Sequence, residues 1–151
     1  MTLQASLAAQ PNLTANRASR RRTILLVEDE PFVRDATCSI LQHAGFDVLT
    51  AEDASEALET FEKWRYSIAL VMTDMVLPGA TGAQLGENLR RRSPELVVLV
   101  TSGYWNPEYT IESPESRTYF LPKPYTRRSL VEKVEAVLAT TTLKQAATQA
   151  G

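Results

Sequence analysis

The chain has 151 residues, of which 44% are apolar and 23% are charged, as expected for one globular domain with a substantial core. The formal net charge of −2 argues against a general binder of nucleic acid or membrane surfaces. The single histidine excludes a histidine-based metal cluster, and the single cysteine, Cys38, excludes an internal disulfide. Because no apolar stretch has transmembrane length and no signal peptide pattern opens the sequence, we expect a cytoplasmic protein without membrane contact.

An ordered domain is predicted over residues 23–139. Residues 1–22 are polar and end in an arginine cluster, which is typical of a disordered basic tail. Residues 140–151 are mostly Ala, Thr and Gln, and we expect a disordered tail there as well. These twelve residues are too few for a DNA-binding or enzymatic output domain, so we expect no direct DNA binding.

The first predicted strand covers residues 23–27 and leads directly into an acidic run at residues 28–30. A helix is predicted to begin near Pro31, and Gly45 supplies its stop. Its apolar residues recur at spacings of three and four, which predicts an inward face. That face consists of Val33, Ala36, Ile40, Leu41 and Ala44.

The second predicted unit begins with a short strand at residues 47–50. Asp53 and Glu56 are close to a capping box, so a helix is expected to start there. Its inward face would carry Ala57, Leu58 and Phe61, with Trp64 as a further candidate.

The third predicted strand is the apolar run at residues 70–73, which ends at Asp74. Residues 75–79 must then turn, because the run closes with Pro78 and Gly79. A helix capped by Thr81 follows and ends in three consecutive arginines, a composition that suits a helix C-terminus.

Two further strands are predicted at residues 96–101 and 119–122, and Thr126 is expected to cap a final helix. Strand and helix signals therefore alternate five times with short connections. This alternation predicts an α/β fold with a doubly wound, five-stranded parallel sheet and helices on both faces.

Ionisable residues follow three of these strands, namely Glu28 and Asp29, Asp74, and Lys123. Because the carboxyl ends of parallel strands meet at one edge of a sheet, we expect these side chains to converge. Such a cluster of acids is costly unless a divalent cation or a phosphoryl group occupies the space. The pattern predicts a hard metal site beside a nucleophilic Asp74, although Glu28 and Asp29 alone fit helix capping equally well.

Four motifs together resemble the receiver domains of two-component response regulators. They are residues 26–30, residues 74–79 with Gly82, residues 101–104 and residues 121–124. The resemblance covers residues 23–139 and implies a flavodoxin-like strand order 2-1-3-4-5. Residues 104–117 depart from the family, because Pro107 and Pro114 allow only a short or irregular fourth helix. We expect this segment to be mobile, to contact a partner and to reorder on phosphorylation.

The resemblance implies that Asp74 takes a phosphoryl group from the phosphohistidine of a histidine kinase or a histidine phosphotransfer protein. It also implies that Mg²⁺ is held directly by Asp29, Asp74 and the Val76 carbonyl, with Glu28 acting mainly through water. Apart from self-phosphorylation and slow autodephosphorylation, no enzymatic activity is expected. The chain would be a stand-alone receiver or one taken from a hybrid kinase, and its downstream protein is unknown.

The same resemblance assigns phosphoryl-binding roles to the Ser102 hydroxyl, the Lys123 ammonium, and the amides of Met75 and Gly103. Ser102 and the aromatic residue three positions before the lysine, Phe120, would form the conformational switch. Phe lacks the hydroxyl of Tyr, so a rotamer switch is expected rather than a hydrogen-bonding one.

Three other functional classes fit the sequence less well. A phosphohydrolase of the haloacid dehalogenase type needs a second acid two residues after its nucleophile, where this chain has Val76. A nucleotide-binding Rossmann domain needs a G-x-G-x-x-G motif after the first strand, and the sequence has none. A degenerate receiver, acting as a phosphorylation-independent interaction module, remains the main alternative.

Overall fold

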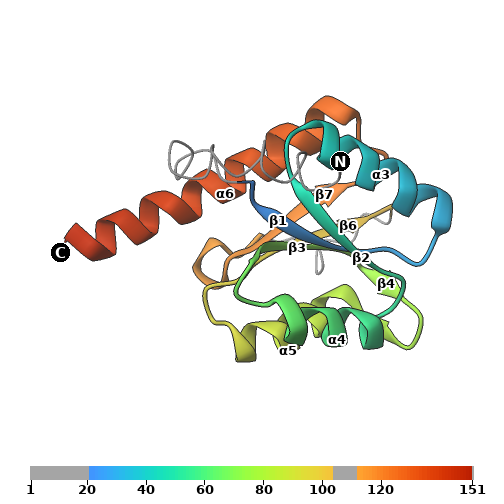
Figure 1. Cartoon of the computed structure of the whole chain (residues 1–151), viewed down its shortest axis with the longest axis horizontal. Helices are drawn as coiled ribbons and strands as arrows, with labels where there is room; N and C mark the ends of the chain where they lie inside the picture. The colour runs from blue at the N-terminus through green and yellow to red at the C-terminus, as the bar shows by residue number, and fades with distance from the viewer. Residues whose placement is uncertain (1–20, 104–111, 151) are drawn as a thin grey trace, which may run out of the picture.

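Five parallel strands form the sheet in the order β2-β1-β3-β6-β7, with α3 and α6 on one face and α4 and α5 on the other (Figure 1). This computed structural model describes residues 21–103 and 112–150, with side chains up to residue 140. The strands are β1 Thr23–Val27, β2 Asp47–Ala51, β3 Ile68–Asp74, β6 Val97–Ser102 and β7 Thr118–Pro122. The helices are α3 Pro31–His43, α4 Ala54–Trp64, α5 Gly82–Arg92 and α6 Arg127–Ala150. The predicted doubly wound, flavodoxin-like fold is confirmed.

The helix starts follow from local capping, as the sequence predicted. The Asp53 carboxylate accepts a hydrogen bond from the Glu56 amide at 2.8 Å and caps α4. Thr81 and Gln84 form a reciprocal capping box at the start of α5, with both hydrogen bonds at 3.0 Å. Thr126 accepts from the Ser129 amide at 3.0 Å and fixes the start of α6. Each bond satisfies a backbone donor that the first helical turn leaves unpaired.

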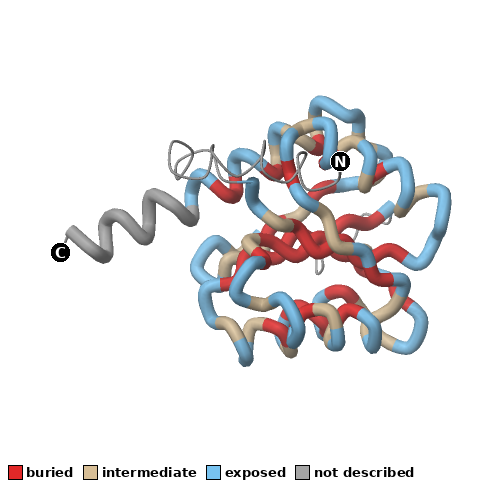
Figure 2. The backbone as a smooth tube through the Cα atoms, in the orientation of Figure 1, coloured by how far each residue is buried: buried red, intermediate tan, exposed pale blue. Residues whose placement is uncertain are grey.

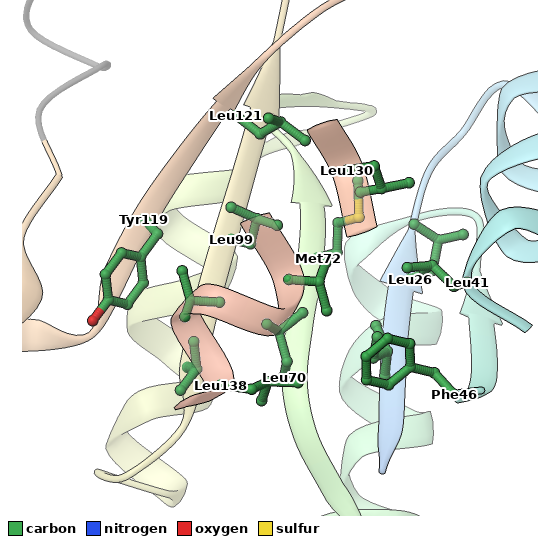
Figure 3. Close-up of a cluster of buried hydrophobic side chains, with 14 residues drawn as sticks. Leu26, Leu41, Phe46, Leu70, Met72, Leu99, Tyr119, Leu121, Leu130 and Leu138 are labelled. Carbon is green, nitrogen blue, oxygen red and sulfur yellow. The ribbon is translucent and has the colours of Figure 1, made fainter. Parts of the chain in front are cut away.

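Two apolar layers lie against the sheet, one on each face, and together they contain most of the buried residues (Figure 2). The layer beneath α3 and α6 includes the side chains labelled in Figure 3, among them Leu26, Met72, Leu99 and Leu130. The central strand β3 is buried on both sides, which explains its almost continuous apolar run. Packing against both faces fixes the strand ends at one edge.

The buried face of α3 differs from the predicted one at Ala36, which is exposed. Thr37 and Leu41, one turn apart, are the fully buried residues of this helix. Apolar spacing alone missed Thr37 because its side chain is polar. Trp64, a further candidate for the inward face of α4, is 45% exposed and is the last residue of that helix.

Helix α6 continues to Ala150, past the boundary near residue 139 that the sequence analysis set, and its end projects away from the sheet (Figure 1). Ala, Leu, Lys and Gln are strong helix formers, and no Pro or Gly interrupts this stretch. Among the described residues, no helix is both long and apolar enough to cross a membrane. The predicted tail at residues 1–20 lies outside the described residues.

The described part of the connection between β6 and β7 contains one 3-10 turn, η1 Pro114–Ser116. This agrees with a short or irregular fourth helix. The expectations that residues 104–117 are mobile and contact a partner rest largely on residues 104–111, which lie outside the described residues.

Candidate functional site

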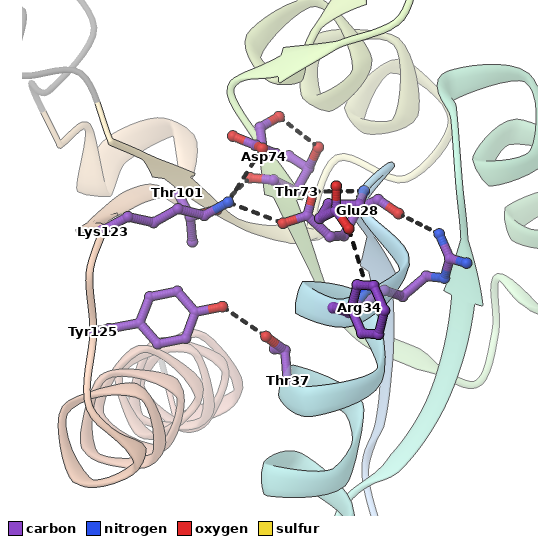
Figure 4. Close-up of polar contacts among 10 residues, drawn as sticks. Glu28, Arg34, Thr37, Thr73, Asp74, Thr101, Lys123 and Tyr125 are labelled. Atoms are coloured by element: carbon purple, nitrogen blue, oxygen red, sulfur yellow. Dashed lines mark hydrogen bonds and ion pairs between the residues drawn. The ribbon is translucent and has the colours of Figure 1, made fainter.

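Parallel strand register brings the predicted site residues to the carboxyl edge of the sheet. Asp74 is the last residue of β3, where it pairs with Thr101 of β6. Ser102 ends β6 and pairs with Pro122 of β7, directly before Lys123. Glu28 follows the end of β1, and its amide donates to the Ala51 carbonyl at the end of β2. The predicted convergence is therefore present in the structure (Figure 4).

Three carboxylates gather at this edge. Glu28 is only 4% exposed, Asp74 is half-buried and Asp29 is exposed. Each offers an oxygen atom within 4.8 Å of the oxygens of the other two. Such a set of hard oxygens, with one member open to solvent, fits a cation of the Mg²⁺ type that keeps several of its waters.

The Lys123 ammonium compensates part of this negative charge. Its Nζ donates to Glu28 Oε1 at 2.9 Å and to Asp74 Oδ2 at 3.2 Å. Burial disfavours the charge of Lys123, but the hydrogen bond to Glu28 and the negative charge of Asp74 outweigh burial and raise the pKa of the lysine. Lys123 therefore carries its proton at neutral pH.

Glu28 has the opposite balance of effects. Burial raises its pKa, the nearby charge of Asp74 raises it further, and Lys123 offsets these effects only in part. Lys123 therefore compensates only part of the cost of burying the Glu28 charge.

Backbone contacts hold the chain immediately after Asp74. The strands β4 Val76–Leu77 and β5 Ala80–Thr81 form an antiparallel hairpin that the sequence predicted only as a turn. The Gly82 amide then donates to the Met75 carbonyl at 2.7 Å. A Cβ atom on Gly82 would lie 2.3 Å from the Asp74 carbonyl oxygen, so this close approach requires glycine.

The Met75 amide has a different position from the one expected of a phosphoryl ligand. It donates to the Thr101 carbonyl at 2.7 Å, because the β3 to β6 hydrogen bonding continues one residue past Asp74. Gly103 follows β6 and is exposed. A Cβ atom built on this residue would have no other atom within 4 Å. Val76 is 59% exposed in the hairpin.

The two predicted switch residues differ in burial. Ser102 is 5% exposed, while Phe120 is half-buried and packs on the layer beneath α4 and α5. The neighbouring Tyr119 is buried on the opposite face, beneath α3 and α6. The Phe120 amide donates to Glu112 at 3.2 Å, and Glu112 also forms an ion pair with Lys133 of α6.

Sequence reasoning missed three residues near the site. Arg34 donates to the Glu28 carbonyl at 2.8 Å, and the hydroxyls of Tyr125 and Thr37 share a hydrogen bond of 2.7 Å. One signal for the pair was available, because Thr37 is a polar residue in an otherwise apolar stripe. A second was the position of Tyr125, two residues after Lys123.

Comparisons with known proteins agree with this geometry. The family described as response regulator receiver domain matches residues 24–135. The sensor kinase CckA of Brucella abortus is 34% identical over 125 residues, covering 82% of this chain and 13% of that protein. The chain also spans about half the length of several other curated relatives.

Solved structures give the same result. The crystal structure of the CckA receiver domain is similar with a TM-score of 0.67 and 34% identity, covering 77% of this chain and 98% of that one. TrrA from Thermotoga maritima, in complex with Mg(2+)-BeF, has a TM-score of 0.67 and 27% identity, with 77% and 98% covered. The chain belongs to the receiver domain family of two-component response regulators.

Proposed function

We propose that this receiver accepts a phosphoryl group on Asp74, with Mg²⁺ bound, from the phosphohistidine of a histidine kinase or a histidine phosphotransfer protein. The observation that carries the proposal is the position of Lys123, which bridges Asp74 and the buried Glu28 at the edge where three carboxylates meet. A nucleophilic carboxylate, a metal-binding acid set and a fixed cation are the parts that phosphoryl transfer requires.

The proposed step joins one oxygen of Asp74 to phosphorus. The phosphorus–nitrogen bond of the donor breaks, its electron pair stays on the imidazole, and an acyl phosphate forms on Asp74. In the transition state, negative charge spreads over the equatorial phosphoryl oxygens. Lys123 is placed to hold one of them with its ammonium, and the hydroxyl of Ser102 and the amide of Gly103 are the proposed contacts on the β6 side.

Asp29 and Asp74 are the proposed direct ligands of Mg²⁺, with the Val76 carbonyl as a third protein oxygen. When bound, Mg²⁺ would add positive charge to the site and stabilise negative charge on the phosphoryl oxygens. Glu28 is the proposed outer ligand, acting through water, because one of its oxygens is already held by Lys123. The Met75 amide is left out of the proposed phosphoryl contacts, because it already donates to the Thr101 carbonyl.

Phosphorylation would draw Ser102 and Lys123 toward Asp74 and change the rotamer of Phe120 on the adjacent strand. Phe120 packs on the layer beneath α4 and α5, so its movement would alter the surface around η1 and β7. We propose that a downstream protein, the second partner of this receiver, binds the surface around η1 and β7.

Labelling with a small phosphodonor tests the proposal. Acetyl phosphate with Mg²⁺ should add one phosphoryl group to the wild-type chain, as read by mass spectrometry, and EDTA should prevent it. Asp74→Asn should abolish the labelling, whereas Asp35→Asn, an exposed acid on α3, should leave it unchanged. A wild-type chain that binds Mg²⁺ but is never labelled would instead favour the degenerate receiver, and labelling of Asp74→Asn would move the nucleophile elsewhere.

A further inference from the structure

The hydrogen bond between Tyr125 and Thr37 joins two segments that are far apart in the sequence. Tyr125 Oη and Thr37 Oγ1 are 2.7 Å apart, and Thr37 is 2% exposed (Figure 4). A buried hydroxyl that loses its partner pays the cost of desolvation without compensation, so this bond is strongly favoured over an open arrangement. A phenylalanine would fill the same space as Tyr125 but could not make this bond.

Both segments carry residues of the proposed phosphoryl site. Tyr125 lies two residues after Lys123, and Thr37 lies on α3, the helix that begins directly after the acidic run containing Glu28. The Lys123–Glu28 ion pair and the Tyr125–Thr37 hydrogen bond therefore connect the same two segments. Residues 123–126 form the loop between β7 and α6, and we refer to them as the Lys123 loop. At the start of this loop, the Lys123 amide donates to the Ser102 carbonyl at 2.9 Å.

From these contacts we infer that Tyr125 and Thr37 form a strap that positions Lys123 for phosphoryl transfer. The inference rests on the proposed function of Asp74. The ion pair with Glu28 must weaken when the ammonium turns to a phosphoryl oxygen, whereas the strap does not involve the ammonium and stays in place. The strap thus keeps the loop fixed while the lysine side chain changes partners.

The protonation of Tyr125 supports a persistent bond. Burial raises the pKa of the tyrosine, and this effect outweighs the opposing effect of the Thr37 hydrogen bond. The hydroxyl therefore keeps its proton throughout the neutral range.

Two single substitutions remove the bond with little change in shape, namely Tyr125→Phe and Thr37→Val. With phosphoramidate as donor and saturating Mg²⁺, each should slow phosphorylation of the folded protein about three- to tenfold, the loss expected for one hydrogen bond. Mg²⁺ affinity should stay within about twofold. The double variant should be no slower than either single variant, because both remove the same bond.

The controls separate positioning from general destabilisation. Thr37→Ser keeps a hydroxyl and should be phosphorylated at the wild-type rate. Tyr119→Phe removes the hydroxyl of a buried tyrosine outside the loop and should not change the rate. If Tyr125→Phe lost phosphorylation rate and Mg²⁺ affinity to the same extent, the substitution would have disturbed the whole site. That result would overturn the inference.

A second readout does not depend on phosphorylation. The NMR signal of the Lys123 side chain in the metal-free protein should shift and sharpen in Tyr125→Phe and Thr37→Val, as expected of a less restrained ammonium, and should be normal in Thr37→Ser. If the wild type accepts no phosphoryl group, the proposed function fails, yet this signal still decides whether the strap holds Lys123. An unchanged signal in both hydroxyl-deleted variants would overturn the inference.

Discussion

Lys123 makes a shorter contact with Glu28, at 2.9 Å, than with Asp74, at 3.2 Å. Before any cation binds, the ammonium is therefore shared between the proposed nucleophile and the most buried acid of the site. In the proposed reaction, a phosphoryl group on Asp74 would draw the ammonium away from Glu28. The site predicts a different consequence for each of the three acids and for the lysine.

Asp29 is predicted to matter more for metal binding than Glu28. Asp29→Ala removes an exposed carboxylate, proposed as a direct ligand, and should weaken Mg²⁺ binding by about tenfold or more. Glu28→Gln should have a smaller effect, because we propose that this side chain contacts Mg²⁺ only through water, and it already pairs with Lys123. Isothermal titration with Mg²⁺ measures both constants, and equal losses would contradict the proposed division of roles.

Lys123→Ala should separate metal binding from phosphoryl transfer. Mg²⁺ affinity should be retained, because the ammonium is not a ligand. Phosphorylation by acetyl phosphate should become slower, or should no longer produce the change in intrinsic fluorescence that we expect for the wild type. Unchanged kinetics together with an unchanged spectral response would count against this role.

The same substitution should also destabilise the metal-free protein. Without the ammonium, the buried carboxylate of Glu28 loses its 2.9 Å partner, which should cost about 1–3 kcal/mol in the free energy of unfolding. Urea denaturation with and without Mg²⁺ measures this cost, and part of it should be recovered when Mg²⁺ is present. A loss that Mg²⁺ does not reduce would argue that cation and lysine do not neutralise the same acids.

Gly82→Ala should disturb the backbone that carries Asp74. The added Cβ would lie 2.3 Å from the Asp74 carbonyl oxygen, a backbone atom that cannot move aside without moving the strand end. We expect a loss of about 1–3 kcal/mol in stability, although alanine is the better helix former. Gly103→Ala is the matched control, because its Cβ would meet no atom within 4 Å. Similar denaturation midpoints for the two variants would contradict the close approach.

Cys38 should react slowly in the folded protein. Burial, and then the negative charge of Asp35, raises the pKa of this thiol above its ordinary value of 9.0, so less thiolate is present at pH 8 than in the unfolded chain. Alkylation by iodoacetamide at pH 8 should therefore be slower in buffer than in urea. Because the folded-state pKa is the higher one, the contribution of Cys38 to stability is complete below pH 9.0 and is lost as the pH rises through the folded-state value.

The parts of the fold that sequence could predict are those with local causes. Asp53 and Thr81 carry the capping signals of α4 and α5, and the structure has both helices start there. The run ending at Asp74 is apolar on both strand faces, which led to its assignment as a buried strand. The convergence of Glu28, Asp74 and Lys123 followed from the single rule that parallel strands end at the same edge.

The remaining features depend on contacts between distant segments. The partner of the buried Thr37 is Tyr125, 88 positions later in the sequence, and the apolar spacing of α3 could not identify that partner. The hydrogen bond of the Met75 amide reaches the Thr101 carbonyl of β6, which lies on a separate segment of the chain. The extent of α6 beyond residue 139 was missed for the opposite reason, because a composition read as a tail also has high helix propensity.

The two sides of Asp74 are held by different kinds of interaction. On one side, the hairpin is fixed by main-chain hydrogen bonds and by a glycine, so its outward side chains, such as Val76, are not needed to keep its shape. On the other side, the loop after β7 depends on the side chains of Lys123 and Tyr125. Substitutions at exposed positions of the hairpin can therefore change which molecules reach Asp74, while the loop with Lys123 and Tyr125 keeps its structure. Access to the proposed nucleophile and the response to its proposed phosphorylation could therefore change independently of each other.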